Sequence, residues 1–268
     1  MNFLDTAVAR RRERVLADFG SLTSVERSIL LRCARDARPR EDLMIMRDRT
    51  DVGVVAEVKK ASPSEGPIAS ARSASAQARA YAAGGATAIS VLTEPEYFDG
   101  SFADLSDVVD AVERPIMCKD FIVDPIQLYM ARASGADAVL LMISVLGAAT
   151  HDFVEHAWSL GLGPVVEVAS MDELDVACTL NAEVIAVNAR DLQTLRVDRT
   201  RQLEIVSEAA AACDVFVIAA SGIETRADVE AAAEAGADAV LVGTSLMRSS
   251  DPEAAVRALT GVPKRPRR

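Results

Sequence analysis

Short apolar runs alternate along most of the chain with Ala-rich segments of helical period. The runs lack the in–out alternation of a half-exposed strand, which is typical of parallel strands buried on both faces. Eight strands are predicted, each followed by a helix. The strands are 53–59, 87–92, 115–119, 138–143, 164–168, 184–188, 215–220 and 239–243, and the helices are 70–83, 101–112, 124–134, 150–161, 170–180, 198–212, 224–235 and 251–260. This succession predicts an α/β fold, a (β/α)8 TIM barrel.

A short motif recurs where predicted helices lead into strands. Gly85-Ala86-Thr87, Gly135-Ala136-Asp137 and Gly236-Ala237-Asp238 precede the second, fourth and eighth strands, and a fainter copy at Asn181 precedes the sixth. Each copy starts with a Gly or Asn, which suits the left-handed residue that ends a helix. Either a two-unit module was used four times, or these loops share one cap chemistry. Both explanations favour the barrel.

The chain before residue 53 has a different pattern. Apolar positions from Phe3 to Leu16 predict a helix with arginines on the opposite face, and a second helix is predicted from Ser24 to Ala34 with Ser24 as its N-cap. No Gly/Ser linker follows. We therefore expect residues 1–50 to form a helical extension covering a barrel at 51–260, with 261–268 as a disordered basic tail.

Composition narrows the class of function. The length of 268 residues is ordinary for one barrel, and 50% hydrophobic against 4% aromatic residues predicts an aliphatic core. The net charge of −11 argues against nucleic acid as a partner. No signal peptide or membrane-spanning run is evident, so a cytoplasmic protein with no membrane partner is expected. The four cysteines are widely spaced, which predicts neither a zinc site nor a disulfide framework.

Polar residues gather at the carboxyl ends of the predicted strands, where barrels of this kind carry their chemistry. Glu57 and Lys59 point the same way because side chains alternate along a strand. Alone they would indicate a structural ion pair. The other strand ends carry Thr93-Glu94, Lys119-Asp120, Ser144, Glu167, Asn188 and Arg190, Ser221-Gly222, and Gly243-Thr244-Ser245. Burying so many charged side chains at the same end of the barrel costs free energy unless they bind or react with a substrate. The Gly and hydroxyl residues after the last two strands favour a phosphorylated substrate.

Six segments carry a resemblance to a known family. They read AEVKKASPS at 56–64, AISVLT at 88–93, KDFIVD at 119–124, NARDL at 188–192, SGI at 221–223 and GTSLMR at 243–248. Together they resemble indole-3-glycerol phosphate synthase, the ring-closing enzyme of tryptophan biosynthesis, over nearly the whole chain. The resemblance implies a carboxy-lyase without metal or organic cofactor. Its reaction converts 1-(2-carboxyphenylamino)-1-deoxyribulose 5-phosphate to indole-3-glycerol phosphate, carbon dioxide and water.

The resemblance also implies residue roles. Lys119 would protonate the ketone oxygen as the ring carbon attacks, and Glu167 would be the base of the later dehydration. Glu57 would pair with the lysines, and Lys59 would be a second cation near the phosphate. The remaining implied set is Ser62, Asn188 and Arg190 at the polar periphery, Pro63 and Phe121 at the aromatic ring, Ser221 at the substrate, and Gly222, Gly243 and Thr244 at the phosphate. The N-terminal helices and the 62–68 loop would cover the mouth.

One position departs from the family pattern. Strand seven of the family ends in Glu-Ser-Gly, and here it reads Ala219-Ala220-Ser221-Gly222. Ala220 therefore lacks a carboxylate that would face the lysines. Three hypotheses follow: a synthase working at reduced rate, a paralogue that closes a related ring on a modified substrate in a specialised pathway, or a non-catalytic barrel that binds a phosphorylated ligand. The retained charged residues argue against the third.

A further alternative is a phosphoribosylanthranilate isomerase-like activity, which needs a Cys/Asp acid–base pair. Cys118 is adjacent to Lys119 and should point outward, which argues against it. The expected partner is a small phosphorylated aromatic amino-sugar. We expect a monomer or a weak homodimer.

Overall fold

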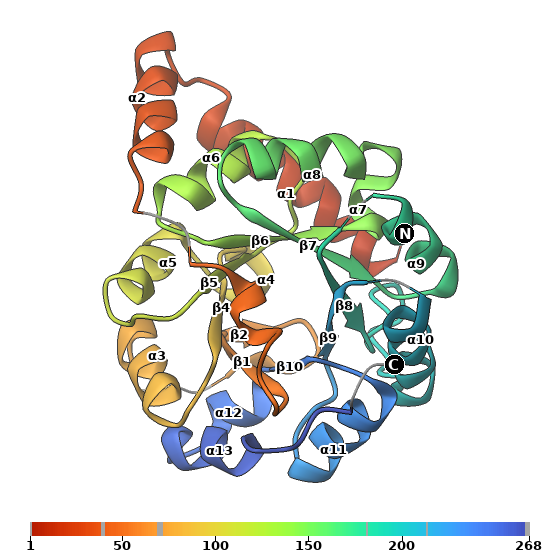
Figure 1. The fold of residues 1–268 in the computed structure, drawn as a ribbon. Coiled ribbons are helices and arrows are strands. Elements are labelled where there is room, and N and C mark those ends of the chain that lie inside the picture. Colours follow the sequence, from red (N-terminus) through yellow and green to blue (C-terminus); the bar gives the residue numbers. More distant parts are fainter. Residues whose placement is uncertain (1, 39–40, 69–71, 181, 213, 266–268) are drawn as a thin grey trace.

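The barrel is the central feature of the computed structural model, which describes residues 2–38, 41–68, 72–180, 182–212 and 214–265. Parallel strands close in the order β1-β10-β9-β8-β7-β6-β5-β4. They are β1 (Gly53–Val58), β4 (Ala88–Leu92), β5 (Ile116–Lys119), β6 (Ala138–Met142), β7 (Gly163–Val168), β8 (Val184–Asn188), β9 (Phe216–Ala220) and β10 (Ala239–Val242). Figure 1 shows helices around this ring. The predicted (β/α)8 barrel is confirmed.

A longer helix follows each barrel strand, as predicted. The helices are α3 (Ala74–Ala83), α5 (Phe102–Val109), α6 (Ile126–Ala133), α8 (Thr150–Ser159), α9 (Met171–Thr179), α10 (Arg199–Ala212), α11 (Arg226–Ala235) and α13 (Pro252–Leu259). Local chemistry sets several starts. Asp251 caps α13 by accepting from the Ala254 amide at 3.0 Å, with Pro252 in the first turn. Residues 70 and 71 of the first predicted helix lie outside the described residues.

Several short elements have no counterpart among the predicted ones. These are the hairpin of β2 (Ala61–Ser62) and β3 (Gly66–Pro67), the helical turns α4 (Pro95–Phe98), α7 (Ile143–Leu146) and α12 (Thr244–Arg248), and the 3-10 turns η1 (Leu43–Met46) and η2 (Gly147–Ala149). Segments this short contain too few positions to show a hydrophobic period.

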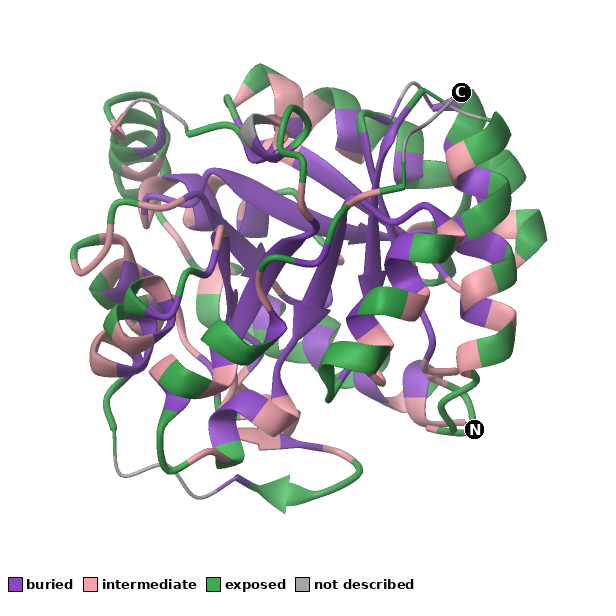
Figure 2. Ribbon diagram, turned by 60° about the horizontal axis from the view of Figure 1, so that its bottom comes forward, coloured by how far each residue is buried: buried purple, intermediate pink, exposed green. Residues whose placement is uncertain are grey.

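Each strand is buried on both faces, which explains the continuous apolar runs. Val55 and Ile218 point into the barrel interior, whereas their neighbours Val54 and Val217 pack against the surrounding helices. Figure 2 shows the strands as buried and the outer helix faces as exposed. The interior layer supports the functional groups at its carboxyl end.

The recurring Gly-Ala motif has a structural reason. Gly85, Gly135 and Gly236 have φ values of 96°, 89° and 104°, in the left-handed region that favours glycine. Asp137 then accepts a hydrogen bond from the Ile116 amide, and Asp238 accepts one from the Val217 amide, both at 2.8 Å. The motif therefore ends a helix and also ties two strands together at their amino ends. The copy at residue 181 starts outside the described residues.

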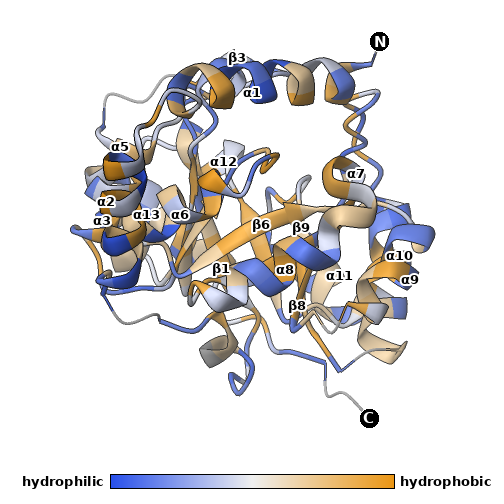
Figure 3. Ribbon diagram, turned by 90° about the horizontal axis from the view of Figure 1, so that it is seen from above, coloured by the Kyte–Doolittle hydropathy of each residue, from blue (hydrophilic) through white to orange (hydrophobic). Residues whose placement is uncertain are grey.

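Two helices precede the barrel. Figure 3 shows α1 (Phe3–Phe19) across one end of the barrel, on the same side as β3. Helix α2 (Ser24–Arg35) packs on α6. Its N-cap is Thr23 and not Ser24, because Thr23 forms a reciprocal capping box with Glu26.

The basic C-terminal segment contacts the barrel as far as residue 265. The Lys264 amide donates to Thr50 O at 2.9 Å, and Lys264 Nζ donates to Met46 O at 2.7 Å. Arg265 Nη1 donates to Glu234 O at 3.0 Å. Residues 266–268 lie outside the described residues.

Within the described ranges, no helix combines the length and the apolar character that crossing a membrane requires. Cys178 is disulfide-bonded, whereas Cys33 and Cys118 are free. The wide spacing of the cysteines had given no sign of this bond, because spacing in sequence does not report proximity in the fold.

Candidate active site

Two lysine–carboxylate pairs lie at the carboxyl ends of the strands. Lys59 Nζ lies 3.0 Å from Glu57 Oε1, and Lys119 Nζ lies 3.7 Å from Glu167 Oε2. Both carboxylates are buried, at 3% and 4% exposure. The pairs come from β1, β5 and β7, so the barrel brings together residues that are far apart in sequence.

The two pairs differ in how tightly they are held. The Lys59–Glu57 distance is that of a hydrogen bond, whereas 3.7 Å between Lys119 and Glu167 is too long for one. Asn188 Nδ2 donates to the other oxygen, Glu167 Oε1, at 3.0 Å. Lys119 is thus attracted to a fixed carboxylate without being bonded to it, which leaves its ammonium able to donate to a substrate.

Electrostatics link Glu57 to the other cations of the site. Burial by itself raises the pKa of Glu57, but the charges of Lys59, Lys119 and Arg190 outweigh that effect and hold its pKa below the usual range. Glu57 is therefore ionised at neutral pH. The Tyr81 hydroxyl donates to Glu57 O at 3.3 Å and so contacts the backbone at this end of the strand.

Gly243 lies directly against the first pair. A Cβ at this position would clash with Glu57 Oε1 and would lie 3.1 Å from Lys59 Nζ. A side chain at this position would therefore displace the Glu57–Lys59 pair from its present geometry. Thr244 begins α12 next to it, and the buried Ser245 Oγ has no hydrogen-bond partner among the described residues. A polar ligand at this point would satisfy that hydroxyl.

The turn after β9 has an unusual backbone. Ser221 and Gly222 have φ values of 69° and 71°, and positive φ is costly for a serine. A side chain at Gly222 would lie 2.8 Å from Val197 Cγ1. Arg199 Nη1 donates to Gly222 O, which holds the turn in place. The turn and Gly243 follow adjacent strands, β9 and β10.

A small apolar slot lies beside the second pair. Phe98, Phe121, Leu140, Met142 and Leu192 line it together with Lys119, Glu167 and Asn188. The Phe98 and Phe121 ring centroids are 6.2 Å apart, with the rings tilted. Such walls suit a flat aromatic ring placed next to the Lys119 ammonium.

Helix α1 contributes to the covering of the site. Leu4 lines a polar hollow of about 290 Å³ together with Glu167, Asn188 and Arg190. The Phe3 ring meets the Tyr97 ring edge-on at 5.0 Å between centroids. An apolar cover of this kind reduces the access of water to the charged groups.

The family model for indole-3-glycerol phosphate synthase matches residues 4–259. The chain belongs to this family. It is 46% identical over 227 residues to an indole-3-glycerol phosphate synthase from Mycolicibacterium smegmatis, covering 84% of this chain and 83% of that one. It is 44% identical over 234 residues to indole-3-glycerol phosphate synthase 1 from Streptomyces coelicolor, covering 87% and 86%.

Solved structures extend the likeness to the fold. A thiamine phosphate pyrophosphorylase from Pyrococcus furiosus aligns with a TM-score of 0.59 at 18% identity, over 78% of this chain and 93% of that one. At this identity the match shows a shared barrel architecture alone.

The geometry disfavours the isomerase alternative within this synthase-family chain. Cys118 points out of the barrel into the layer between strands and helices, and it is fully buried there. Burial raises the pKa of its thiol to about 12. A thiol in that position cannot act as an acid or base in the site. Among the described residues, no group of three or more His, Cys, Asp or Glu could hold a metal ion.

The hairpin contributes the predicted residues Ser62 and Pro63. Ser62 is buried and its Oγ has no hydrogen-bond partner among the described residues. Neither Ser62 nor Pro63 is among the described residues that line the slot or the polar hollow. The hairpin is joined to α12 by an ion pair between Glu65 and Arg248 at 3.0 Å.

Some lining residues had no clear sequence signal. Leu4, Leu140 and Leu192 read as ordinary apolar positions, and their place at the site depends on the closed barrel. Phe98 had a usable signal, because Glu94 precedes Pro95 as a cap before a first-turn proline. That pattern marks α4 and hence the aromatic residue it carries.

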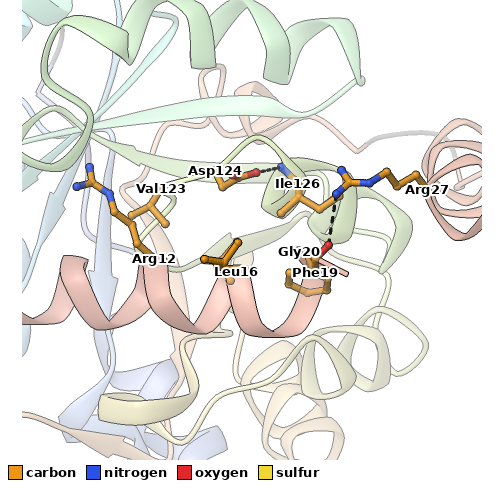
Figure 4. Close-up of a pocket in the computed structure, with 9 residues that line it drawn as sticks. Arg12, Leu16, Phe19, Gly20, Arg27, Val123, Asp124 and Ile126 are labelled. Atoms are coloured by element: carbon orange, nitrogen blue, oxygen red, sulfur yellow. Dashed lines mark hydrogen bonds between the residues drawn. The ribbon is translucent and has the colours of Figure 1, made fainter. Parts of the chain in front are cut away.

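Another hollow lies at the outer side of α1 and is separate from this site. Figure 4 shows it between α1, α2 and the loop before α6. Its lining includes Arg12, Leu16, Phe19, Arg27, Val123 and Ile126. None of the predicted site residues is among the residues that line it.

Proposed function

We propose that the chain catalyses the decarboxylating ring closure of 1-(2-carboxyphenylamino)-1-deoxyribulose 5-phosphate to indole-3-glycerol phosphate. The observation that carries the proposal is the placement of Lys119. Its ammonium lies beside an aromatic-lined slot and 3.7 Å from a carboxylate that Asn188 holds. The substrate ring would enter the slot and bring its ketone within reach of Lys119.

The first step forms the carbon–carbon bond. The ring carbon that bears the carboxylate attacks the ketone carbon, and the carbonyl electron pair moves to oxygen, which takes a proton from Lys119. General acid catalysis of this kind contributes roughly 10²- to 10⁴-fold. The carboxylate then leaves as carbon dioxide, and its bonding electrons restore the aromatic ring. Arg190 lines the polar hollow next to Glu167 and would hold the carboxylate until then.

The second step is a dehydration. The hydroxyl formed from the ketone takes a proton from Lys59 and leaves as water. Glu167 accepts the proton of the adjacent carbon, and the electrons of that C–H bond form the new ring double bond. Asn188 holds Glu167 for this role. Gly222, Gly243 and Thr244 would bind the phosphate at the loops after β9 and β10, with Ser62, Pro63, Phe121 and Ser221 toward the rest of the substrate.

Ala220 does not remove any of these groups. It is buried in the barrel interior and pairs in register with Asn188, so its methyl group faces the same interior as the reacting residues. Glu57 and Glu167 each face a lysine without a third carboxylate. We therefore favour a working synthase of reduced rate over a paralogue with a modified substrate.

The test follows indole fluorescence during turnover of the carboxyphenylamino-deoxyribulose phosphate by the native chain, Ala220→Glu and Ala220→Gln. We expect the native chain to form product. Ala220→Glu should raise kcat about threefold to tenfold, because a carboxylate facing the lysines adds about 1 kcal/mol of charge stabilisation. Ala220→Gln has the same size without the charge and should give no gain. Substrate binding without indole formation in all three proteins would refute the synthase proposal.

A further inference from the structure

Arg11 is a charged residue in an unexpected place. The arginines of α1 were predicted to face away from the barrel, yet Arg11 is only 3% exposed. Its Nε donates to Asp120 Oδ1 at 2.8 Å and its Nη2 donates to Asp120 Oδ2 at 2.6 Å. The Thr93 hydroxyl donates to Asp120 Oδ2 at 2.7 Å. The pair therefore joins α1 to the loops that follow β4 and β5.

An ion pair as deeply buried as Arg11–Asp120 adds little to the free energy of unfolding. Removing two charges from water offsets most of their attraction, and an apolar pair of similar volume often serves stability as well or better. What the forked guanidinium adds is orientation, because two parallel hydrogen bonds fix a carboxylate in plane and direction. The value of Arg11 therefore lies in where it holds Asp120.

Asp120 lies between two residues of the candidate site. Lys119 precedes it and Phe121 follows it, and these two residues line the apolar slot, as Asp120 itself does. Arg11, the other member of the pair, is on α1. Leu4 is buried on the same helix, seven residues and about two turns away. Helix α1 thus carries both Leu4, which covers the site, and Arg11, which bonds to Asp120 between Lys119 and Phe121.

We propose that Arg11 is a positioning residue that acts through Asp120 to aim the Lys119 ammonium and the Phe121 ring into the site. This inference rests on the proposed function, since it gives Lys119 the role of general acid. Burial raises the pKa of Asp120, and the Arg11 charge and hydrogen bonds oppose that rise. Without Arg11 a buried carboxylate would lose its partner, and the segment would rearrange to solvate it.

The experiment compares kcat and KM of folded Arg11→Met and Arg11→Lys. We expect Arg11→Met to lower kcat about 10- to 100-fold, the effect of a misplaced catalytic group, with a smaller change in KM. Arg11→Lys keeps the charge but lacks the fork, so it should recover part of the loss. Arg10→Met is the matched control, because Arg10 pairs with Glu96 at the surface of the same helix. It should keep kcat within about twofold.

Coupling to Lys119 separates positioning from a general structural effect. If Arg11 acts through Lys119, the double variant Arg11→Met/Lys119→Met loses no more kcat than Lys119→Met alone. Losses that multiply would overturn the proposal. If Arg11→Met does not fold, Asp120→Asn takes its place, and native kcat in that variant would equally overturn it. Native kcat in Lys119→Met would instead refute the proposed function itself, and this inference with it.

Discussion

The two ends of the barrel use buried carboxylates in different ways. At the amino end, Asp137 and Asp238 accept hydrogen bonds from the amides of neighbouring strands. At the carboxyl end, Glu57 and Glu167 face lysines, and each keeps one oxygen, Oε2, without a hydrogen bond from any described residue. The same chemical group thus completes the sheet at one end and remains partly unsatisfied at the other.

This difference in hydrogen bonding assigns the Asp137 and Asp238 carboxylates to stability and the Glu57 and Glu167 carboxylates to function. A buried polar atom without a hydrogen bond costs about 1–3 kcal/mol, so it lowers stability unless a ligand provides the partner. The unsatisfied oxygens of Glu57 and Glu167 lie with the unpartnered Ser245 hydroxyl at the end where barrels carry their chemistry. Asp120 is also buried at the carboxyl end, but Arg11 and Thr93 bond it, so the contrast concerns the two carboxylates that face the lysines.

The largest effect is expected at the carboxyl end, from Lys119→Met. This change should lower kcat about 10²- to 10⁴-fold, equivalent to about 2.7–5.5 kcal/mol, because it removes the general acid of the ring-closing step. The free energy of unfolding should also fall at neutral pH, because the buried carboxylates of Glu57 and Glu167 lose the charge of Lys119. Steady-state turnover and urea unfolding measure the two quantities. A loss of less than about tenfold in kcat would contradict the role of Lys119.

An intermediate effect is expected at the amino end, from Asp137→Ala. The change leaves the Ile116 and Glu41 amides without the Asp137 carboxylate, so unfolding free energy should fall by about 1–3 kcal/mol. The kcat of the folded protein should stay within about twofold of native. Asp152→Ala is the control, because that side chain is 88% exposed, and it should change stability by less than about 0.5 kcal/mol. Equal free energies of unfolding for Asp137→Ala and Asp152→Ala would show that the amino-end carboxylate does not stabilise the sheet.

The smallest effect is the pH dependence contributed by Glu57. Its pKa is lower in the folded chain than its ordinary value of 4.5, so the unfolded chain binds the proton more readily. The resulting stabilisation is present above pH 4.5 and is lost as the pH falls through the folded pKa. Urea titrations of native protein and Glu57→Gln should therefore differ by a constant at neutral pH and converge on acidification. A constant difference down to acid pH would show that the lysines do not lower this pKa.

Most of the fold could be predicted because its rules are local. The ends of the eight predicted strands agree with the observed ones to within one residue, since strands buried on both faces form uninterrupted apolar runs. The Gly-led caps at Gly85, Gly135 and Gly236 were equally visible, because left-handed backbone selects glycine. The hairpin and the single-turn helices were missed, since they depend on what they pack against.

The site was predictable only where residues occupy strand ends. Glu57, Lys119, Glu167 and Asn188 could be located because a parallel barrel puts all strand ends on one face. Arg11 could not, because its burial depends on a partner 109 positions away in the sequence. Arg11 lies on the buried face of α1 with Leu4 and Val15, and a sequence pattern does not report that an arginine on that face meets a buried carboxylate.

The closed ring also determines how the chain must fold. Every strand pairing but one joins barrel strands that follow one another in the sequence. The exception joins the first barrel strand, β1, to the last, β10. This seam, with Gly53 beside Ala239, requires the longest loop closure and so has the largest entropic cost. Until it forms, the sheet is open, and β1 and β10 are unpaired edges. In a nascent chain these edges are the surfaces on which intermolecular pairing would begin.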